Sequence, residues 1–187
     1  MQKACYGLSK NMSSFETFHT MQEIRYDAGS TTHEGKMWVI GGNDEASHCL
    51  LSSEIIDPLE SNMISNSVDL PEALCSLSIV RLNSTTSFLI AGAPENQLTS
   101  NRTYYFNHNT NNWTRGPDLI SGRWSHTAGF IKDRVTHTEH LVVVGGHAKI
   151  SLTLDSVEIM FYNENKWTQG TNFVQKIFYY KFRRPSV

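Results

Sequence analysis

The chain has 187 residues, of which 39% are hydrophobic, 11% aromatic and 18% charged, and its 16 basic and 18 acidic residues give a net charge of −2. This composition excludes intrinsic disorder, which requires low hydrophobicity and high net charge, and it provides no basic excess that would indicate nucleic-acid binding. No apolar stretch is long enough to cross a membrane as a helix, and the first ten residues lack the apolar core of a signal peptide.

The clearest predicted elements are three apolar strands that each end in small residues. A continuous apolar run closed by glycine is typical of a buried strand, and glycine permits positive φ and close approach of neighbouring chains. The first small residues of the three runs are 50 and 54 residues apart, which predicts a repeat of about 50 residues. The runs are KMWVIGG, SFLIAG and HLVVVGG, ending at Gly41 and Gly42, at Ala91 and Gly92, and at Gly145 and Gly146.

Large side chains also recur at a spacing of about 50 residues, as Phe15, Met63, Trp113 and Trp167. Each unit also contains short runs bounded by Gly, Asn, Asp and Ser, which in the second unit are LSIVRL, SFLIAG, TYYFN and NNWTRG. Such runs predict antiparallel strands joined by tight turns, and no segment has a capped helical period. We expect Trp113 and Trp167 to be buried between adjacent sheets.

At these residues the sequence resembles the kelch repeat, a family of β-propellers. The shared features are the glycine pair after an apolar strand, the aromatic residue that follows it and a Trp at a fixed distance. IIDPLESNM, with Ile56, Asp57 and Pro58, is similar to the family's tyrosine–aspartate–proline turn, and RWSHTAGF, with Arg123 and His126, is similar to its first strand. The resemblance implies an all-β fold, an incomplete β-propeller of about three and a half four-stranded antiparallel kelch blades.

The expected organisation is one propeller segment over residues 1–173 and an atypical basic and aromatic tail over residues 174–187. Because a ring closes with about four to eight blades, further kelch blades or self-association would be needed to complete it. We expect the tail to be an unpaired edge strand or non-native sequence rather than a nucleic-acid or membrane patch. The predicted blades cover residues 4–21 for a partial blade, then 22–70, 71–119 and 120–173.

The cysteines and glycosylation sequons do not decide whether the protein is secreted or cytoplasmic. Three cysteines are too few for a disulfide scaffold and wrongly spaced for zinc. A bridge between Cys49 and Cys75 is one option; otherwise Cys75 lies in an apolar strand and Cys49, in a loop, is expected to be the more reactive thiol. The third cysteine is Cys5, and the N-glycosylation sequons are at Asn11, Asn83, Asn101 and Asn112, close to the number expected by chance.

Few residues indicate catalysis, and we predict no enzymatic activity, no metal and no other cofactor. His137 and His140 lie close together in THTEH, but this segment joins two strands, where the side chains need not converge on a metal. Tyr104, Tyr105 and His108 are of the ligand types that propeller copper oxidases use, but they come from one blade only. We therefore expect them to pack the blade.

The leading hypothesis is a protein-interaction module. Loops held by a rigid scaffold are where binding residues concentrate, and the resemblance implies binding through the loops at one face of the disc. These loops are the segments NDEASHC, APENQLTSN and HAKISLT. The alternatives are the substrate-recognition part of a ubiquitin-ligase adaptor and, from another class, a propeller oxidase. The candidate contact residues are Arg25, Asn43, Asp44, Glu95, Asn96, Arg123, His147 and Lys149.

Overall fold

The computed structural model describes residues 4–8, 15–57, 64–66, 68–95, 99–133, 135–149, 152–161 and 164–170, and for residues 4–8, 15–19 and 64–66 it describes the backbone alone. Within these ranges every element of regular structure is a β-strand. All pairs of strands are antiparallel. The expected all-β class is confirmed.

The first sheets in the chain are a hairpin and a four-stranded sheet. β1 (Ala4–Leu8) pairs with β2 (Phe15–Thr20). The first large sheet then has its strands in chain order, β3 (Gly29–His33), β4 (Lys36–Ile40), β5 (Ser53–Ile56) and β6 (Ile64–Asn66). β4 is paired on both sides and its last three residues are buried, which explains why KMWVI reads as a continuous apolar run.

Two further large sheets follow. In the second, β7 (Leu74–Cys75) and β8 (Ser78–Arg81) both pair with β9 (Thr86–Pro94), which is followed by β10 (Ser100–Asn107) and β11 (Asn112–Arg115). The third has the order β12 (Thr127–Lys132), β13 (Glu139–Val144), β16 (Val157–Phe161) and β17 (Lys166–Gln169). β14 (His147–Lys149) and β15 (Leu152–Thr153) form a small hairpin between β13 and β16.

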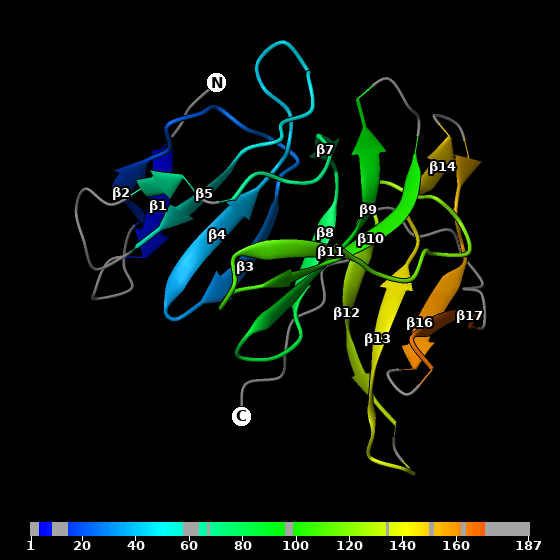
Figure 1. Cartoon of the computed structure of the whole chain (residues 1–187). Helices are drawn as coiled ribbons and strands as arrows, with labels where there is room; N and C mark the ends of the chain where they lie inside the picture. The colour runs from blue at the N-terminus through cyan, green and yellow to red at the C-terminus, as the bar shows by residue number, and fades with distance from the viewer. Residues whose placement is uncertain are drawn as a thin grey trace.

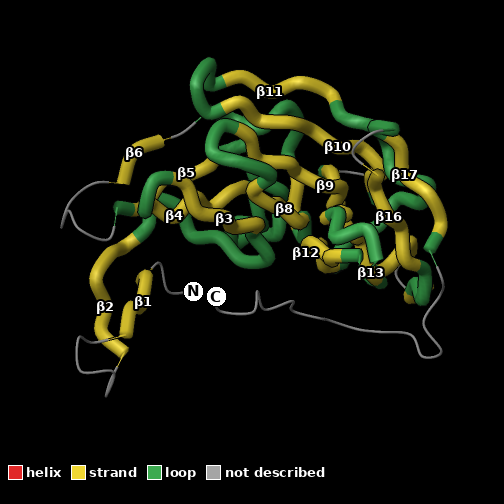
Figure 2. Tube along the Cα trace, turned by 90° about the horizontal axis from the view of Figure 1, so that it is seen from below, coloured by secondary structure: helices red, strands yellow, loops and turns green. Residues whose placement is uncertain are grey.

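The three large sheets stand side by side along an arc (Figures 1 and 2). β3, β8 and β12 lie on the inner side of the arc, and β6, β11 and β17 lie on the outer side (Figure 2). β8 contacts both β3 and β12. The sheets therefore meet through their faces, with the chain passing from the outer strand of one to the inner strand of the next.

The hydrophobic core lies between neighbouring sheets. One cluster joins the first and second large sheets and includes Trp38, Ile40, Leu89 and Phe106. Another joins the second and third large sheets and includes Phe88, Ile90, Leu141, Met160 and Trp167. β8, β9 and β10 of the second sheet therefore have side chains in two cores, one on each face, which is what period-two alternation of buried residues allows.

The two marker tryptophans differ in burial. Trp167 is 2% exposed, and its Nε1 donates to Pro117 O at 3.0 Å, so the prediction for this residue is confirmed. Trp113 is only half-buried, because it packs at the edge of the first cluster, with its ring centroid 5.7 Å from that of Trp38. For Trp113 the prediction was therefore right about the contact between sheets and wrong about full burial. The side chains of Phe15 and Met63 lie outside the described part.

A backbone repeat that the sequence did not reveal runs through the three large sheets. Asp27, Ser76 and Ser125 all have positive φ, of 52°, 51° and 51°. They are 49 residues apart, and Ser76 N donates to Asp27 O at 2.8 Å while Ser125 N donates to Ser76 O at 3.0 Å. One unit is thereby hydrogen-bonded to the next through equivalent residues.

The glycine pairs are required by close contacts with the same segments. Gly146 has φ +86°, and a Cβ there would lie 2.6 Å from Trp124 O, whereas at Gly42, with φ +92°, it would lie 2.7 Å from Tyr26 O. A side chain at either position would collide with backbone and occupy a conformation that L-residues rarely adopt. The pairs therefore mark where each second strand passes the start of its own sheet.

Candidate functional site

The loops expected to bind a partner lie together at one end of the molecule. Their described residues lie at the ends of β4, β9 and β13, which are at the top in Figure 1. We call this surface the glycine-pair face and define it as residues 41–52, 92–95 and 145–149. The described candidates Asn43, Asp44, Glu95, His147 and Lys149 all belong to it, whereas Asn96 lies outside the described residues.

The first loop is folded on itself. Asn43 is 8% exposed and exchanges backbone hydrogen bonds with Tyr26, at 3.0 and 2.8 Å, so its backbone is used inside the protein. The Asp44 carboxylate accepts from His48 N at 2.8 Å and approaches His48 Nδ1 at 3.3 Å. The His48 backbone hydrogen bond is the main cause that lowers the pKa of Asp44. The Tyr26 hydroxyl donates to Ser47 Oγ at 2.8 Å. This network gives the half-buried Asp44 side chain and the exposed His48 side chain a fixed position.

Two contacts connect the first loop to the second sheet. Cys49 N donates to the Glu95 carboxylate at 2.7 Å. Cys49 also forms a disulfide with Cys75 of β7, with 5.2 Å between the Cα atoms, a normal separation for such a bond. Of the alternatives left open by the sequence, the structure has the Cys49–Cys75 bridge, so Cys49 is not a free reactive thiol in this state.

The third loop places an aromatic pair and a cation at the surface. The His147 ring stacks on Trp124, with 4.6 Å between the centroids, and the two residues also form a backbone bridge. Lys149 is exposed at the end of β14. The face therefore carries charges of both signs, Asp44 and Glu95 from the first two sheets and Lys149 from the third.

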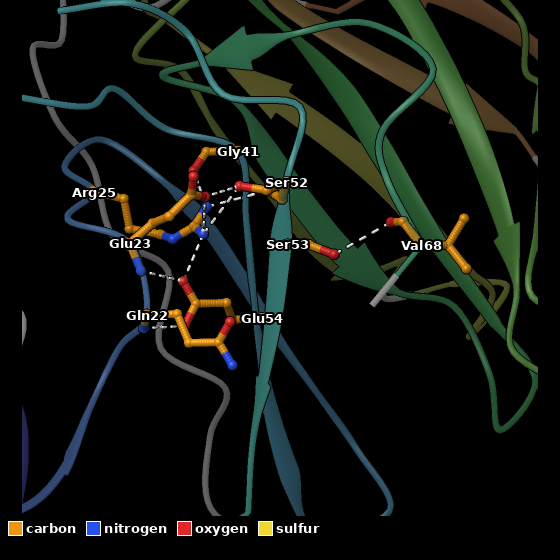
Figure 3. A network of polar contacts seen from close by, with 8 residues as sticks. All are labelled: Gln22, Glu23, Arg25, Gly41, Ser52, Ser53, Glu54 and Val68. Carbon is orange, nitrogen blue, oxygen red and sulfur yellow. Dashed lines mark hydrogen bonds and ion pairs between the residues drawn. The ribbon is translucent and has the colours of Figure 1, made fainter. Parts of the chain in front are cut away.

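Arg25 is buried within an ion pair instead of reaching the surface (Figure 3). Its side chain is 1% exposed and donates to Glu54 Oε1 at 2.7 Å, and it also donates to Gly41 O at 2.9 Å. The Glu54 carboxylate, also 1% exposed, accepts from Gln22 N at 2.8 Å and from Glu23 N at 3.1 Å. The network therefore connects residues 22–25, which precede the first large sheet, to the glycine pair at the end of β4.

Arg123 repeats this arrangement in the third sheet. Its guanidinium donates to Glu158 Oε1 at 2.6 Å and to Gly145 O at 2.8 Å, and both charged side chains are 0% exposed. Glu158 accepts from Ile120 N at 2.7 Å and from Ser121 N at 3.0 Å. Burial lowers the pKa of Arg123, and Glu158 opposes this effect. The expectation that Arg25 and Arg123 contact a partner is not supported by their location, because their donors are used within the fold.

The second sheet has no ion pair at the positions equivalent to Arg25–Glu54 and Arg123–Glu158. Leu74 stands where the other sheets have arginine, two residues before the positive-φ residue, and Tyr104 stands where they have glutamate. The Tyr104 hydroxyl donates to Glu72 Oε1 at 2.8 Å, and Arg102 pairs with the same carboxylate at 2.6 Å. Burial, with smaller contributions from Glu72, raises the pKa of Tyr104 to about 12. In this sheet the charged pair is therefore Glu72 and Arg102, which lies nearer the surface than the ion pairs of the other two sheets.

The three residues considered as ligands of a propeller oxidase each form a hydrogen bond with a different residue. Tyr104 binds Glu72, the Tyr105 hydroxyl donates to Asn165 Oδ1 at 2.8 Å, and His108 Nε2 lies 2.8 Å from Ser87 Oγ. In the described part of the chain no group of three or more His, Cys, Asp or Glu could hold a metal ion. In the THTEH segment, His137 is exposed, while His140 Nε2 lies 3.0 Å from Thr138 Oγ1.

A cavity of about 210 Å³ lies between the first two large sheets, at the end opposite the glycine-pair face, and sequence reasoning missed it. His33 and His108 stack there with 3.8 Å between their ring centroids, and Trp38 is part of the wall. Burial, with smaller effects of His33 and Arg81, lowers the pKa of His108 to about 4. His33 Nδ1 and Trp38 Nε1 are enclosed and lack hydrogen-bond partners among the described residues. Aromatic rings and the polar side chains of Glu34, Lys36 and Asn111 therefore line this cavity together.

The glycosylation sequons differ in accessibility. Asn83 and Asn112 are exposed, whereas Asn101 is half-buried and its Nδ2 donates to Leu119 O at 3.1 Å. Asn11 lies outside the described residues.

No protein-family model matches the chain, and no curated protein sequence is significantly similar to it. Over the residues that the structure describes, no helix has the length and apolar character needed to cross a membrane.

Proposed function

We propose that this chain is a segment of a kelch-type β-propeller and that it binds a partner protein through the glycine-pair face. Three four-stranded or larger antiparallel sheets, side by side along an arc with their first strands innermost, support the propeller interpretation. The positive-φ residues at a step of 49 and the matching networks of Arg25 and Arg123 support a structural repeat. A closed ring would need further blades or a second copy.

One observation carries the binding proposal: loops from successive sheets are joined to one another at the same end of the fold. The Cys49–Glu95 hydrogen bond connects the first and second loops, and the disulfide connects the first loop to β7 of the second sheet. The second and third sheets are connected there by Gly92 N, which donates to Arg123 O at 3.0 Å. Rigid loops bind with a smaller loss of conformational entropy than mobile ones. The face therefore combines a fixed backbone with exposed charges of both signs.

Among the residues that the structure describes, the arrangement favours this interaction role over an enzyme. The aromatic and histidine residues of the second sheet have separate partners, as described above. Substrate recognition for a ubiquitin ligase would be one use of the same binding face.

The proposal is tested with a photo-crosslinking amino acid placed at Lys149 or, as a control, at Val135. Lys149 is exposed on the glycine-pair face, and Val135 is 88% exposed in the turn between β12 and β13 at the opposite end. We expect a discrete protein from a cell extract to be crosslinked from position 149 and not from position 135.

Charge reversal then tests the face with the purified partner. Asp44→Lys should weaken binding about tenfold or more, because Asp44 belongs to the proposed contact; this is the scale of an important interface residue. Glu139→Lys, an exposed charge at the start of β13, is the matched control and should leave affinity unchanged. Equal crosslinking from both positions, or equal affinity of the two variants, would refute the proposal.

A further inference from the structure

The disulfide occupies a particular place in the fold: it joins the first loop of the glycine-pair face to the neighbouring sheet. Cys49 is half-buried in that loop, and Cys75, 7% exposed, is in β7. The residues before Cys49 are held mainly within the loop, through Asp44, His48 and the Asn43–Tyr26 bridge. The covalent bond and the Cys49–Glu95 hydrogen bond both connect Cys49 to the second sheet.

The residues after Cys49 are connected to the second sheet by backbone hydrogen bonds. Gly42 N donates to Leu74 O at 2.9 Å, and Leu74 N donates to Leu50 O at 3.3 Å. These bonds do not depend on the sulfur atoms. Opening the disulfide would therefore leave residues 44–49 connected to the second sheet less tightly, through the Cys49–Glu95 hydrogen bond, and would leave the contact between the two sheets in place.

The two thiols of the reduced form would also have a hydrogen-bond acceptor in the same structure. The Sγ atoms of Cys49 and Cys75 each lie 3.3 Å from Ala93 O. Each thiol, once reduced, can donate its S–H to this carbonyl oxygen, which is a weak hydrogen bond. Reduction thus exchanges a covalent connection for two weak ones without exposing a polar group that lacks a partner.

We propose that Cys49 and Cys75 form a reversible thiol–disulfide switch that sets how tightly residues 44–49 are held on the glycine-pair face. This inference rests on the proposed function for its consequence, namely control of partner binding, but its structural part stands without a partner. The reductant is a small thiol or dithiol, with glutathione and dithiothreitol as representatives of the class.

The reaction is balanced by ordinary thiol–disulfide exchange. A thiolate of the reductant attacks Sγ of Cys49, the more exposed cysteine, and the Cys75 thiolate leaves and takes up a proton. A second reductant thiolate then attacks the mixed disulfide and releases the Cys49 thiolate, which is also protonated. The protein gains two electrons and two protons, and the reductant becomes a disulfide.

The test is hydrogen exchange of the full chain before and after dithiothreitol treatment, with alkylation of free thiols to count the cysteines that are reduced. The backbone N–H groups of Asp44, Ser47, His48 and Cys49 are all hydrogen-bonded in the oxidised form. On reduction we expect their exchange to accelerate about tenfold or more, because a covalent limit on local opening is removed. The amides of β13, in the third sheet, should not change.

Variants provide a second measurement. Cys49→Ser and Cys75→Ser should exchange quickly at residues 44–49 in oxidising buffer and should not respond to dithiothreitol. Cys5→Ser is the matched control and should behave as the unmodified chain. Reoxidation should restore slow exchange.

Three results would overturn the inference: three free thiols under oxidising conditions, loop exchange that does not change on reduction, or equal acceleration throughout the chain. The last result would identify the bond as a structural crosslink. Because no partner takes part in this test, its failure leaves the proposed binding function standing. Conversely, a working switch without any crosslinked partner would leave the switch standing and refute the binding proposal.

Discussion

Replacing Arg123 by leucine should strongly destabilise the fold. The change removes the guanidinium that donates to Glu158 at 2.6 Å and to Gly145 O at 2.8 Å. It leaves the Glu158 carboxylate, which is 0% exposed, with two backbone donors and no counter-charge. Removing one partner of a buried ion pair costs about 3–5 kcal/mol, and we expect the free energy of unfolding to fall by an amount in this range.

The second sheet supplies the design of a compensating variant. At the equivalent positions it has Leu74 and Tyr104 in place of an ion pair. Arg123→Leu combined with Glu158→Tyr removes both charges, and replacing a buried pair by apolar groups is often nearly neutral. Ile120, one of the backbone donors that loses its acceptor, is exposed and can turn to water. The double variant should therefore be more stable than Arg123→Leu alone.

Urea unfolding followed by tryptophan fluorescence measures these differences, and unchanged m-values would show that the same transition is compared. Arg115→Leu is the matched control, because the Arg115–Asp118 pair is on the surface, with side chains 42% and 46% exposed. Such a pair contributes less than about 1 kcal/mol. The reasoning is refuted if Arg123→Leu costs no more than Arg115→Leu, or if the double variant is the less stable of the two.

Three further effects are expected. Trp167→Ala should lower the free energy of unfolding by about 3–5 kcal/mol, because the ring is 2% exposed between two sheets; a loss in urea melts below about 1 kcal/mol would contradict this position. Burial, with the positive charge of Arg123, lowers the pKa of His126 to about 3 from 6.5. Between these pH values only the unfolded state gains a proton, so stability should fall as the pH drops through this window, with a shallower slope for His126→Gln in melts at several pH values. Gly146→Ala should lower the melting temperature more than Gly35→Ala does: both have positive φ, but a Cβ at 146 lies 2.6 Å from Trp124 O whereas one at 35 meets no atom within 4 Å.

The local sequence determined the strands. HLVVVGG became β13 and its glycine pair, and TYYFN and NNWTRG became parts of β10 and β11. These segments could be predicted because strand pairing and turn chemistry leave a short-range pattern, namely apolar runs, small turn residues and a Trp at a fixed distance. The same pattern placed Trp167 correctly between two sheets.

Only the tertiary structure decided which polar residues are inside. Arg25 and Arg123 were expected to contact a partner, because they lie at the starts of the predicted first strands, next to the binding loops. Their partners Glu54 and Glu158 are 29 and 35 residues away, so the ion pairs exist only once the sheets have formed. The Cys49–Cys75 bond and the positive φ of Asp27, Ser76 and Ser125 likewise depend on how one unit meets the next. No local pattern encodes such contacts, because the free energy that holds them comes from the packing of neighbouring sheets.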